Sequence, residues 1–152
     1  MRAHALYRTT TQTFEAWAPS VLGVALRIWL AMIFFKSGLT KIASWDTTLV
    51  LFQYEYQVPL LSPVLAAYAG AAAELVLPVL LVLGLFTRLS AAALFAFNAV
   101  AAISYPDISE AGMKDHVHWG MLLTVPLALG GGCFALDYLW QRLRQQRAAH
   151  VA

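Results

Sequence analysis

Four long apolar stretches constrain the fold of this chain more than any other feature. They lie near residues 20–43, 61–86, 88–106 and 117–140. A helix of roughly 20 apolar residues crosses the hydrocarbon core of a bilayer, and a helix satisfies every backbone polar group within the segment. The composition agrees, because 61% of the residues are hydrophobic and only 12% are charged, and the mean hydropathy is +0.67. The sequence therefore predicts an all-α membrane protein, a bundle of four transmembrane helices.

The basic residues between these stretches predict how the chain is oriented. Arg2 and Arg8 precede the first stretch, Arg88 lies between the second and third, and three more arginines follow the fourth. The remaining connections carry Lys41 and Lys114 among five carboxylates. Because basic segments stay on the cytoplasmic side, we expect both termini in the cytoplasm and the bundle in a bacterial inner membrane. The expected domains are a cytoplasmic tail over 1–19, a membrane domain over 20–140 and a basic cytoplasmic tail over 141–152.

Charge and cysteine content argue against two classes of function. The arginines are scattered and form no basic, aromatic face, so we expect no nucleic-acid partner. Cys133 is the only cysteine, so the chain can form no internal disulfide and can run no Cys-x-x-Cys exchange by itself. Any thiol chemistry would need a partner.

Glycines mark two places where helices are expected to end or to pack closely. In "GLFTR", between the second and third stretches, Gly84 can leave the helix and Thr87 can cap the next one. This pattern predicts a tight antiparallel hairpin. The three glycines at 130–132 lie in the fourth stretch, where they favour close approach of another backbone or a kink, with a cavity wall as the alternative.

The segment 44–60 is too polar to be a further span. Leu49, Phe52 and Tyr56 have the spacing of one apolar helical face. We therefore predict a short interfacial helix between the first and second spans, with Trp45, Tyr54 and Tyr56 in the headgroup region. Two interpretations of its role remain, an anchoring segment and a lid over a site.

Ionisable residues inside apolar stretches are costly, so each is a functional hypothesis. Arg27, Gly38 and Lys41 fall on one stripe of the first helix, and Lys36 points the opposite way, where its long stem can reach the interface. Such charges either form structural pairs or surround a polar cavity open to a proton, a headgroup or a small ligand. The candidates for binding a ligand or handling protons are Arg27, Lys41, Glu74 and Asp137, with Gly38, Lys36, Gly84 and Arg88 as polar or structural support.

The depth of each charge limits its partners. At about 1.5 Å per residue, Glu74 is expected roughly level with residue 31 of the first helix. Arg27 or Lys36 could then pair with Glu74, and the spacing does not choose between them. Asp137 is expected near the inner surface, within reach of Arg27 or Arg88.

The stretch "MKDHVHWGM" combines residue types that can bind copper. The candidate ligands are His116, His118 and Met121. On a regular helix the two histidines point about 200° apart, so they can share one ion only if the segment begins in a non-helical form. A proton-handling role and simple interfacial packing are the alternatives.

Several motifs in sequence order resemble the DoxX family of small four-helix membrane proteins. They are Arg27, then "SGLTKI", "VPLLSP", "AAELVLPVLLVLGLFTRLSA" and "HWGMLLTVPLALGGGCFALD", which together span roughly residues 21–140. Where the family commonly has Gly-Pro-Gly followed by Ser-Leu-Asp, this chain has three glycines and then Ala135, Leu136 and Asp137. The polar positions that match the family are Arg27, Gly38, Lys41, Glu74, Gly84, Arg88 and Asp137.

The resemblance implies a function only in outline. Some DoxX-like chains are linked to quinone-dependent oxidation of sulfur compounds or to oxidative-stress complexes, and others accompany small cysteine-containing, metal-binding modified peptides. We expect an accessory subunit of a redox or metal-handling system that binds quinone or lipid between Arg27, Lys41 and Glu74. The alternatives are a non-catalytic scaffold or assembly factor for a partner enzyme or metal-binding peptide, and a small transporter or metal conduit. A partner protein or a homo-oligomer is expected, and whether the chain itself is an enzyme stays open.

Overall fold

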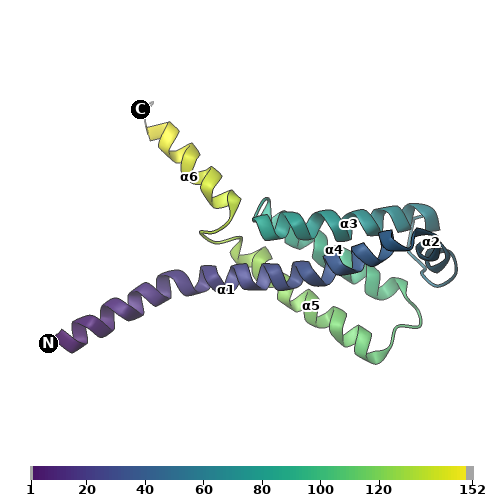
Figure 1. The fold of residues 1–152 in the computed structure, drawn as a ribbon, viewed down its shortest axis with the longest axis horizontal. Helices are drawn as coiled ribbons and strands as arrows, with labels where there is room; N and C mark the ends of the chain where they lie inside the picture. The colour runs from purple at the N-terminus through teal and green to yellow at the C-terminus, as the bar shows by residue number, and fades with distance from the viewer. Residues whose placement is uncertain (1, 150–152) are drawn as a thin grey trace.

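The computed structural model describes the backbone of residues 2–149 and the side chains of residues 17–148, and this part of the chain contains helices and no strands. Figure 1 shows α1, α3 and α4 running roughly alongside one another, with α5 lying obliquely and α6 projecting away. The helices are α1 (Arg2–Ala43), α2 (Trp45–Tyr54), α3 (Pro63–Leu83), α4 (Thr87–Ser104), α5 (Glu110–Leu129) and α6 (Leu136–Ala149).

Three helices in the described part of the chain are long and apolar enough to cross a membrane. They are the segment Trp17–Ala43 of α1, and α3 and α4 over their whole lengths. The predicted continuous helix over 117–140 is wrong, because the chain leaves the helix after Leu129 and begins α6 only at Leu136. Gly130 and Gly132 have φ values of 77° and 68°, in a region that glycine enters at no steric cost. The glycine run therefore ends the helix.

The expected domain boundaries fall inside helices. α1 is continuous from Arg2 through Pro19 to Ala43, so the boundary after residue 19 lies within it. The boundary after residue 140 lies within α6. We call the end of the bundle that holds α2 and the α4–α5 connection the α2 end. The opposite end, where the α3–α4 turn meets residues 130–132, is called the glycine end.

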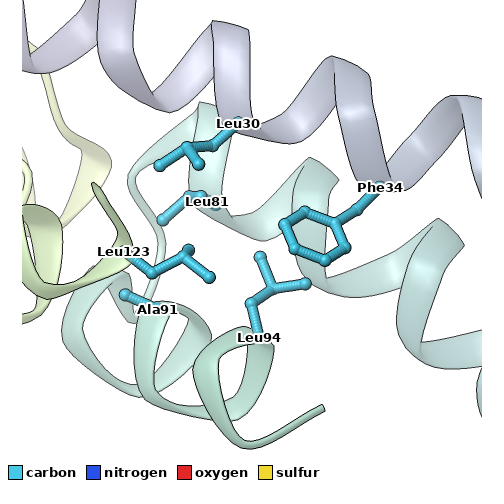
Figure 2. Close-up of a cluster of buried hydrophobic side chains, with 6 residues drawn as sticks. All are labelled: Leu30, Phe34, Leu81, Ala91, Leu94 and Leu123. Carbon is cyan, nitrogen blue, oxygen red and sulfur yellow. The ribbon is translucent and has the colours of Figure 1, made fainter. Parts of the chain in front are cut away.

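A cluster of apolar side chains from four helices holds the bundle together. Figure 2 shows these side chains pointing toward one another between the ribbons. In membranes, helices associate largely through such van der Waals packing. The cluster therefore fixes the relative positions of the helices that carry both polar regions described below. Its buried members are Leu30 and Phe34 of α1, Leu81 of α3, Ala91 and Leu94 of α4, and Leu123 of α5.

The face of α2 predicted from its apolar spacing packs against α3. Phe52 is buried with Ala66 and Ala67, and Leu49 and Tyr56 pack against this group. A hydrogen bond joins the helix to the end of α1, because the Thr48 hydroxyl donates to the carbonyl oxygen of Lys41 at 2.9 Å. The chain between Tyr54 and Pro63 then turns back, and the Ser62 side chain accepts from the backbone N–H of Leu65 to cap α3.

Candidate functional site

Lys41 of α1 and Glu74 of α3 form a mostly buried ion pair. The Lys41 ammonium is 2.8 Å from Oε1 and 2.6 Å from Oε2 of Glu74. Ser37 completes the group, because its hydroxyl donates to Glu74 Oε1 at 3.1 Å and accepts from Lys41 at 3.2 Å. The exposed fraction is 5% for Glu74 and 18% for the Lys41 side chain. Two charges with so little access to water lose most of their hydration, and their direct contacts with each other and with Ser37 offset that loss.

Gly38 sets the register that brings these two residues together. A Cβ atom at Gly38 would be 2.9 Å from the Leu75 side chain and 3.0 Å from Cβ of Glu74. The absence of a side chain therefore lets α1 approach α3 closely. The prediction that Arg27 or Lys36 pairs with Glu74 is therefore wrong. Glu74 lies level with Gly38, about two helical turns along α1 from the expected level of residue 31. Matching the midpoints of the two spans gave the wrong depth, since α3 continues past the end of α1 to support α2.

The ion pair lies on the wall of a cavity at the α2 end. The cavity has a volume of about 470 Å³ and is lined by residues of α1, α2, α3, α4, α5 and the connecting segments. Most of its wall is apolar or aromatic. Small-molecule sites in proteins typically have such walls and volumes of about 300–1,000 Å³. The polar side chains on the wall are those of Ser37, Lys41, Tyr56, Glu74, Ser104, Tyr105 and His116.

Two further polar groups on this wall have unusual environments. The Ser104 hydroxyl is buried and has no hydrogen-bond partner among the described residues, although buried polar atoms usually have one. Tyr56 also lines the cavity, and its ring centroid is 5.3 Å from that of Tyr105. Burial, with a smaller contribution from Tyr105, raises the pKa of the Tyr56 phenol. Both hydroxyls are therefore neutral groups that can donate or accept a hydrogen bond.

The two histidines of α5 face different helices. His116 lines the cavity, and its Nδ1 lies 2.8 Å from Oδ1 of Asn98 on α4. The ring of His118 instead contacts Trp29 of α1 edge-on, with centroids 6.2 Å apart. Because α5 is helical from residue 110, the non-helical start that a shared copper ion requires is absent. Met121 is exposed, and no three His, Cys, Asp or Glu residues within the described ranges gather as metal ligands.

Arg27 lies at the glycine end, away from this cavity. Its side chain is 1% exposed, and Nη1 donates to the carbonyl oxygens of Leu81 and Val82 at 3.2 and 3.3 Å. These carbonyls belong to the last turn of α3, where helical partners run out. The expected site between Arg27, Lys41 and Glu74 is therefore divided into two separate regions.

Asp137 organises the start of α4 at the same end. Gly84 takes the predicted left-handed conformation that ends α3, but Phe86, and not Thr87, is the N-cap, and its side chain makes no capping bond. Asp137 supplies the cap, because it accepts from the backbone N–H of Phe86 at 2.8 Å and from the N–H and hydroxyl of Thr87 at 2.7 and 2.9 Å. Burial alone would raise the pKa of Asp137, but these hydrogen bonds, aided by the charge of Arg27, outweigh it and lower the pKa.

Three further residues named from the sequence contribute no side-chain contact to either polar cluster, although Arg88 and Cys133 lie at the glycine end. Lys36 is exposed on α1, and Arg88 is exposed at the start of α4. Cys133 is partly buried with a free thiol, and its backbone N–H donates to the Ser20 hydroxyl at 3.4 Å. Conversely, the sequence analysis missed Asn98 and Ser104. Asn98 carried a usable signal, because a single amide within an apolar span usually hydrogen-bonds to a neighbouring helix.

The sequence model of the DoxX family matches residues 22–106. The chain belongs to the DoxX family. The matched segment contains both residues of the Lys41–Glu74 pair, together with Arg27 and Gly84. His116 of α5 and Asp137 of α6 lie beyond it. No curated protein and no solved structure matches the chain.

Proposed function

We propose that this DoxX protein binds a quinone or a related lipid in the cavity at the α2 end and serves as an accessory subunit of a membrane redox system. The observation that carries the proposal is the cavity itself. Its wall is largely apolar, yet it includes the Lys41–Glu74 pair and the unpartnered hydroxyl of Ser104. A wall of this kind fits a ligand with an apolar body and a few polar atoms.

The proposal places four crossings in a bacterial inner membrane. α5 has 20 residues, so it is about 30 Å long and can serve as the fourth crossing beside α1, α3 and α4. Arg88 at the start of α4 and the arginines of α6 then lie in the cytoplasm with both termini. In this arrangement α2 lies on the outer surface, and the cavity lies in the outer half of the bilayer.

The polar residues of the wall have distinct roles in this proposal. Lys41, bonded to Glu74 and Ser37, contributes its positive charge to the wall, and the hydroxyls of Ser104 and Tyr56 can donate or accept. Glu74, held between Lys41 and Ser37, is the group suited to take up and release a proton. A bound quinone would supply a carrier of two electrons and two protons. The electrons would come from a partner protein.

A binding measurement in nanodiscs tests this function. We would titrate the purified protein with a decyl-substituted benzoquinone and identify quinones that co-purify with it by mass spectrometry. Glu74→Gln and Lys41→Gln should each weaken binding about tenfold or more, because each removes a charge from the wall. Lys114→Gln is the matched control, since Lys114 is exposed and pairs only with exposed Glu110. Equal binding by wild type, Glu74→Gln and Lys41→Gln would contradict the proposal.

A scaffold function is the second candidate, and the projecting helices favour it. Figure 1 shows the first part of α1 and all of α6 extending away from the bundle. On α6, Arg144 lies over the Trp140 ring at 4.2 Å and Arg142 near the Tyr138 ring at 5.6 Å. Such a basic, aromatic surface suits a partner enzyme or a cysteine-containing, metal-binding peptide. A partner that co-purifies with the wild type but not with an Arg142→Ser/Arg144→Ser variant, with no quinone bound, would favour this candidate.

A further inference from the structure

The backbone carbonyl of His116 fixes the orientation of the Asn98 amide, and this amide in turn fixes the ring of His116. Asn98 is 4% exposed, and its Nδ2 donates to the backbone carbonyl of His116 at 2.8 Å. A carbonyl oxygen can only accept, so the amide atom that faces it must be the NH₂ group. The other amide atom, Oδ1, consequently faces Nδ1 of His116, at 2.8 Å.

This contact determines the tautomer of the imidazole. Oδ1 of Asn98 can only accept a hydrogen bond, so Nδ1 of His116 must carry the proton. A neutral imidazole has one N–H, which leaves Nε2 as a bare acceptor. No described residue donates a hydrogen bond to Nε2 of His116, and the ring lines the cavity beside Trp119, with centroids 5.0 Å apart. The cavity therefore has an acceptor that the protein leaves unused.

We propose that His116 makes the cavity selective for the reduced, hydroxyl-bearing form of the ligand, a hydroquinone. This inference rests on the proposed function and adds the redox state that the site prefers. A hydroquinone hydroxyl can donate to Nε2, whereas the carbonyl of the oxidised quinone is an acceptor that faces another acceptor. Sites built to bond a hydroxyl discriminate against analogues that lack the hydrogen.

Among the other polar groups of the wall, Glu74 is an acceptor whose two oxygens are already held by Lys41 and Ser37, and the hydroxyl groups do not make this distinction. The three N–H groups of Lys41 are taken by Glu74 and Ser37, and the Ser104 hydroxyl can donate to either form or accept. They contribute to binding both forms. Selection between the forms therefore falls to His116, held in place by Asn98.

Three probes with the same decyl chain separate these contributions. They are the benzoquinone, its hydroquinone kept reduced under anaerobic conditions, and the hydroquinone dimethyl ether, which has the same ring but no hydroxyl hydrogen. In nanodiscs, the wild-type protein should bind the hydroquinone about tenfold more tightly than either other probe, the difference expected for one buried hydrogen bond.

Two variants locate the preference. His116→Phe keeps a flat ring but removes the acceptor, so the three affinities should converge. His118→Phe makes the same change two residues away, at a ring that contacts Trp29, and should leave the ratio unchanged. If the wild type binds quinone as tightly as hydroquinone, or if His116→Phe keeps the preference, the inference is wrong while the proposed function stands. If none of the probes binds, both fail.

The tautomer of His116 can be measured in the wild-type protein, so this test does not depend on whether a variant folds. In protein labelled with ¹⁵N-histidine, NMR distinguishes protonated from bare ring nitrogens. We expect His116 to carry its proton on Nδ1, and its Nε2 signal should shift when the hydroquinone is added but not when the dimethyl ether is added. A proton on Nε2 of His116 in the ligand-free protein would overturn the inference.

Discussion

The α2 end and the glycine end each contain a cation of α1 that faces α3 and has little contact with solvent, yet the two cations have different partners. Arg27 donates to backbone carbonyls, whose positions are set by the helix that carries them. Lys41 binds a carboxylate side chain on the wall of a cavity. Backbone partners hold a fold together, whereas side-chain partners can adjust to a ligand. The role of a charged residue inside the membrane is therefore better inferred from the group that it binds than from its charge alone.

Removing the Arg27 side chain should produce the largest loss of stability. Arg27→Met keeps much of the volume but removes the donor to the carbonyls of Leu81 and Val82, although the Leu81 carbonyl still accepts from the N–H of Gly84, so we expect a loss of about 2–4 kcal/mol. The thermal unfolding midpoint in mild detergent measures it. Arg88→Met, on an exposed side chain, should change the stability by less than about 0.5 kcal/mol. A stable Arg27→Met protein that has lost quinone binding would show that Arg27 serves the ligand after all.

Removing both members of the Lys41–Glu74 pair should cost little stability but should abolish quinone binding. Glu74→Leu alone leaves a poorly solvated ammonium, so we expect a loss of about 2–3 kcal/mol. Combining it with Lys41→Met should restore most of that stability, because an apolar pair of similar size can replace a buried ion pair at little cost. The double variant should nevertheless bind no quinone. Binding that survives in a stable double variant would remove the pair from the site.

Asp137→Ala should destabilise the glycine end by about 1–2 kcal/mol, the usual loss for a helix cap. Asp137→Asn, which still accepts hydrogen bonds, should lose less. Asp107→Ala is the matched control, since Asp107 is exposed beyond the other end of α4. Hydrogen exchange at the first turn of α4 should locate the loss, and an Asp137→Ala protein with unchanged protection there would contradict the capping role.

The contribution of Asp137 should also depend on pH in a defined direction. Its folded-state pKa is lowered, so the carboxylate stabilises the fold fully above its ordinary pKa of about 4. That contribution is lost as the pH falls through the lower folded value. The stability difference between wild type and Asp137→Ala should therefore narrow only in that acidic range, as thermal unfolding at a series of pH values would show.

Ser104→Ala should have the smallest effect on stability. Its hydroxyl has no partner in the described part of the chain, so removing it should change the stability of the ligand-free protein by less than about 0.5 kcal/mol or raise it slightly. The affinity for quinone should fall a few-fold if the ligand uses this hydroxyl. Ser109→Ala, outside the cavity, should leave the affinity unchanged. Equal affinities in wild type and Ser104→Ala would exclude Ser104 from the contacts with the ligand.

The sequence predicted the parts of the fold that depend on local chemistry. The apolar runs located α3 and α4, the spacing of Leu49 and Phe52 located the buried face of α2, and Gly84 marked the end of α3. The stripe of Arg27, Gly38 and Lys41 does face α3, since all three contact it. These features repeat or end at fixed intervals along one helix, so they can be read from the chain alone.

The features that the sequence did not predict depend on how one helix is placed against another. The partner of Glu74 required the register of α1 on α3, which Gly38 sets through a contact invisible in the sequence. The cap of α4 comes from Asp137, 50 residues after Thr87. Likewise, the division of the fourth apolar stretch depended on the glycines at 130–132 outweighing its hydrophobicity. Only the packed structure brings these groups together.

The cap that Asp137 provides has a consequence for the order of assembly. Phe86 and Asp137 are 51 residues apart in the chain, and a chain is synthesised from its N-terminus. The α3–α4 hairpin therefore leaves the ribosome before the residue that completes its turn has been made. Until Asp137 has been made, the backbone N–H groups of Phe86 and Thr87 lack the carboxylate that accepts their hydrogen bonds. A residue of α6 thus completes the cap of a helix made much earlier, so a chain that stops before residue 137 would leave the first turn of α4 without its cap.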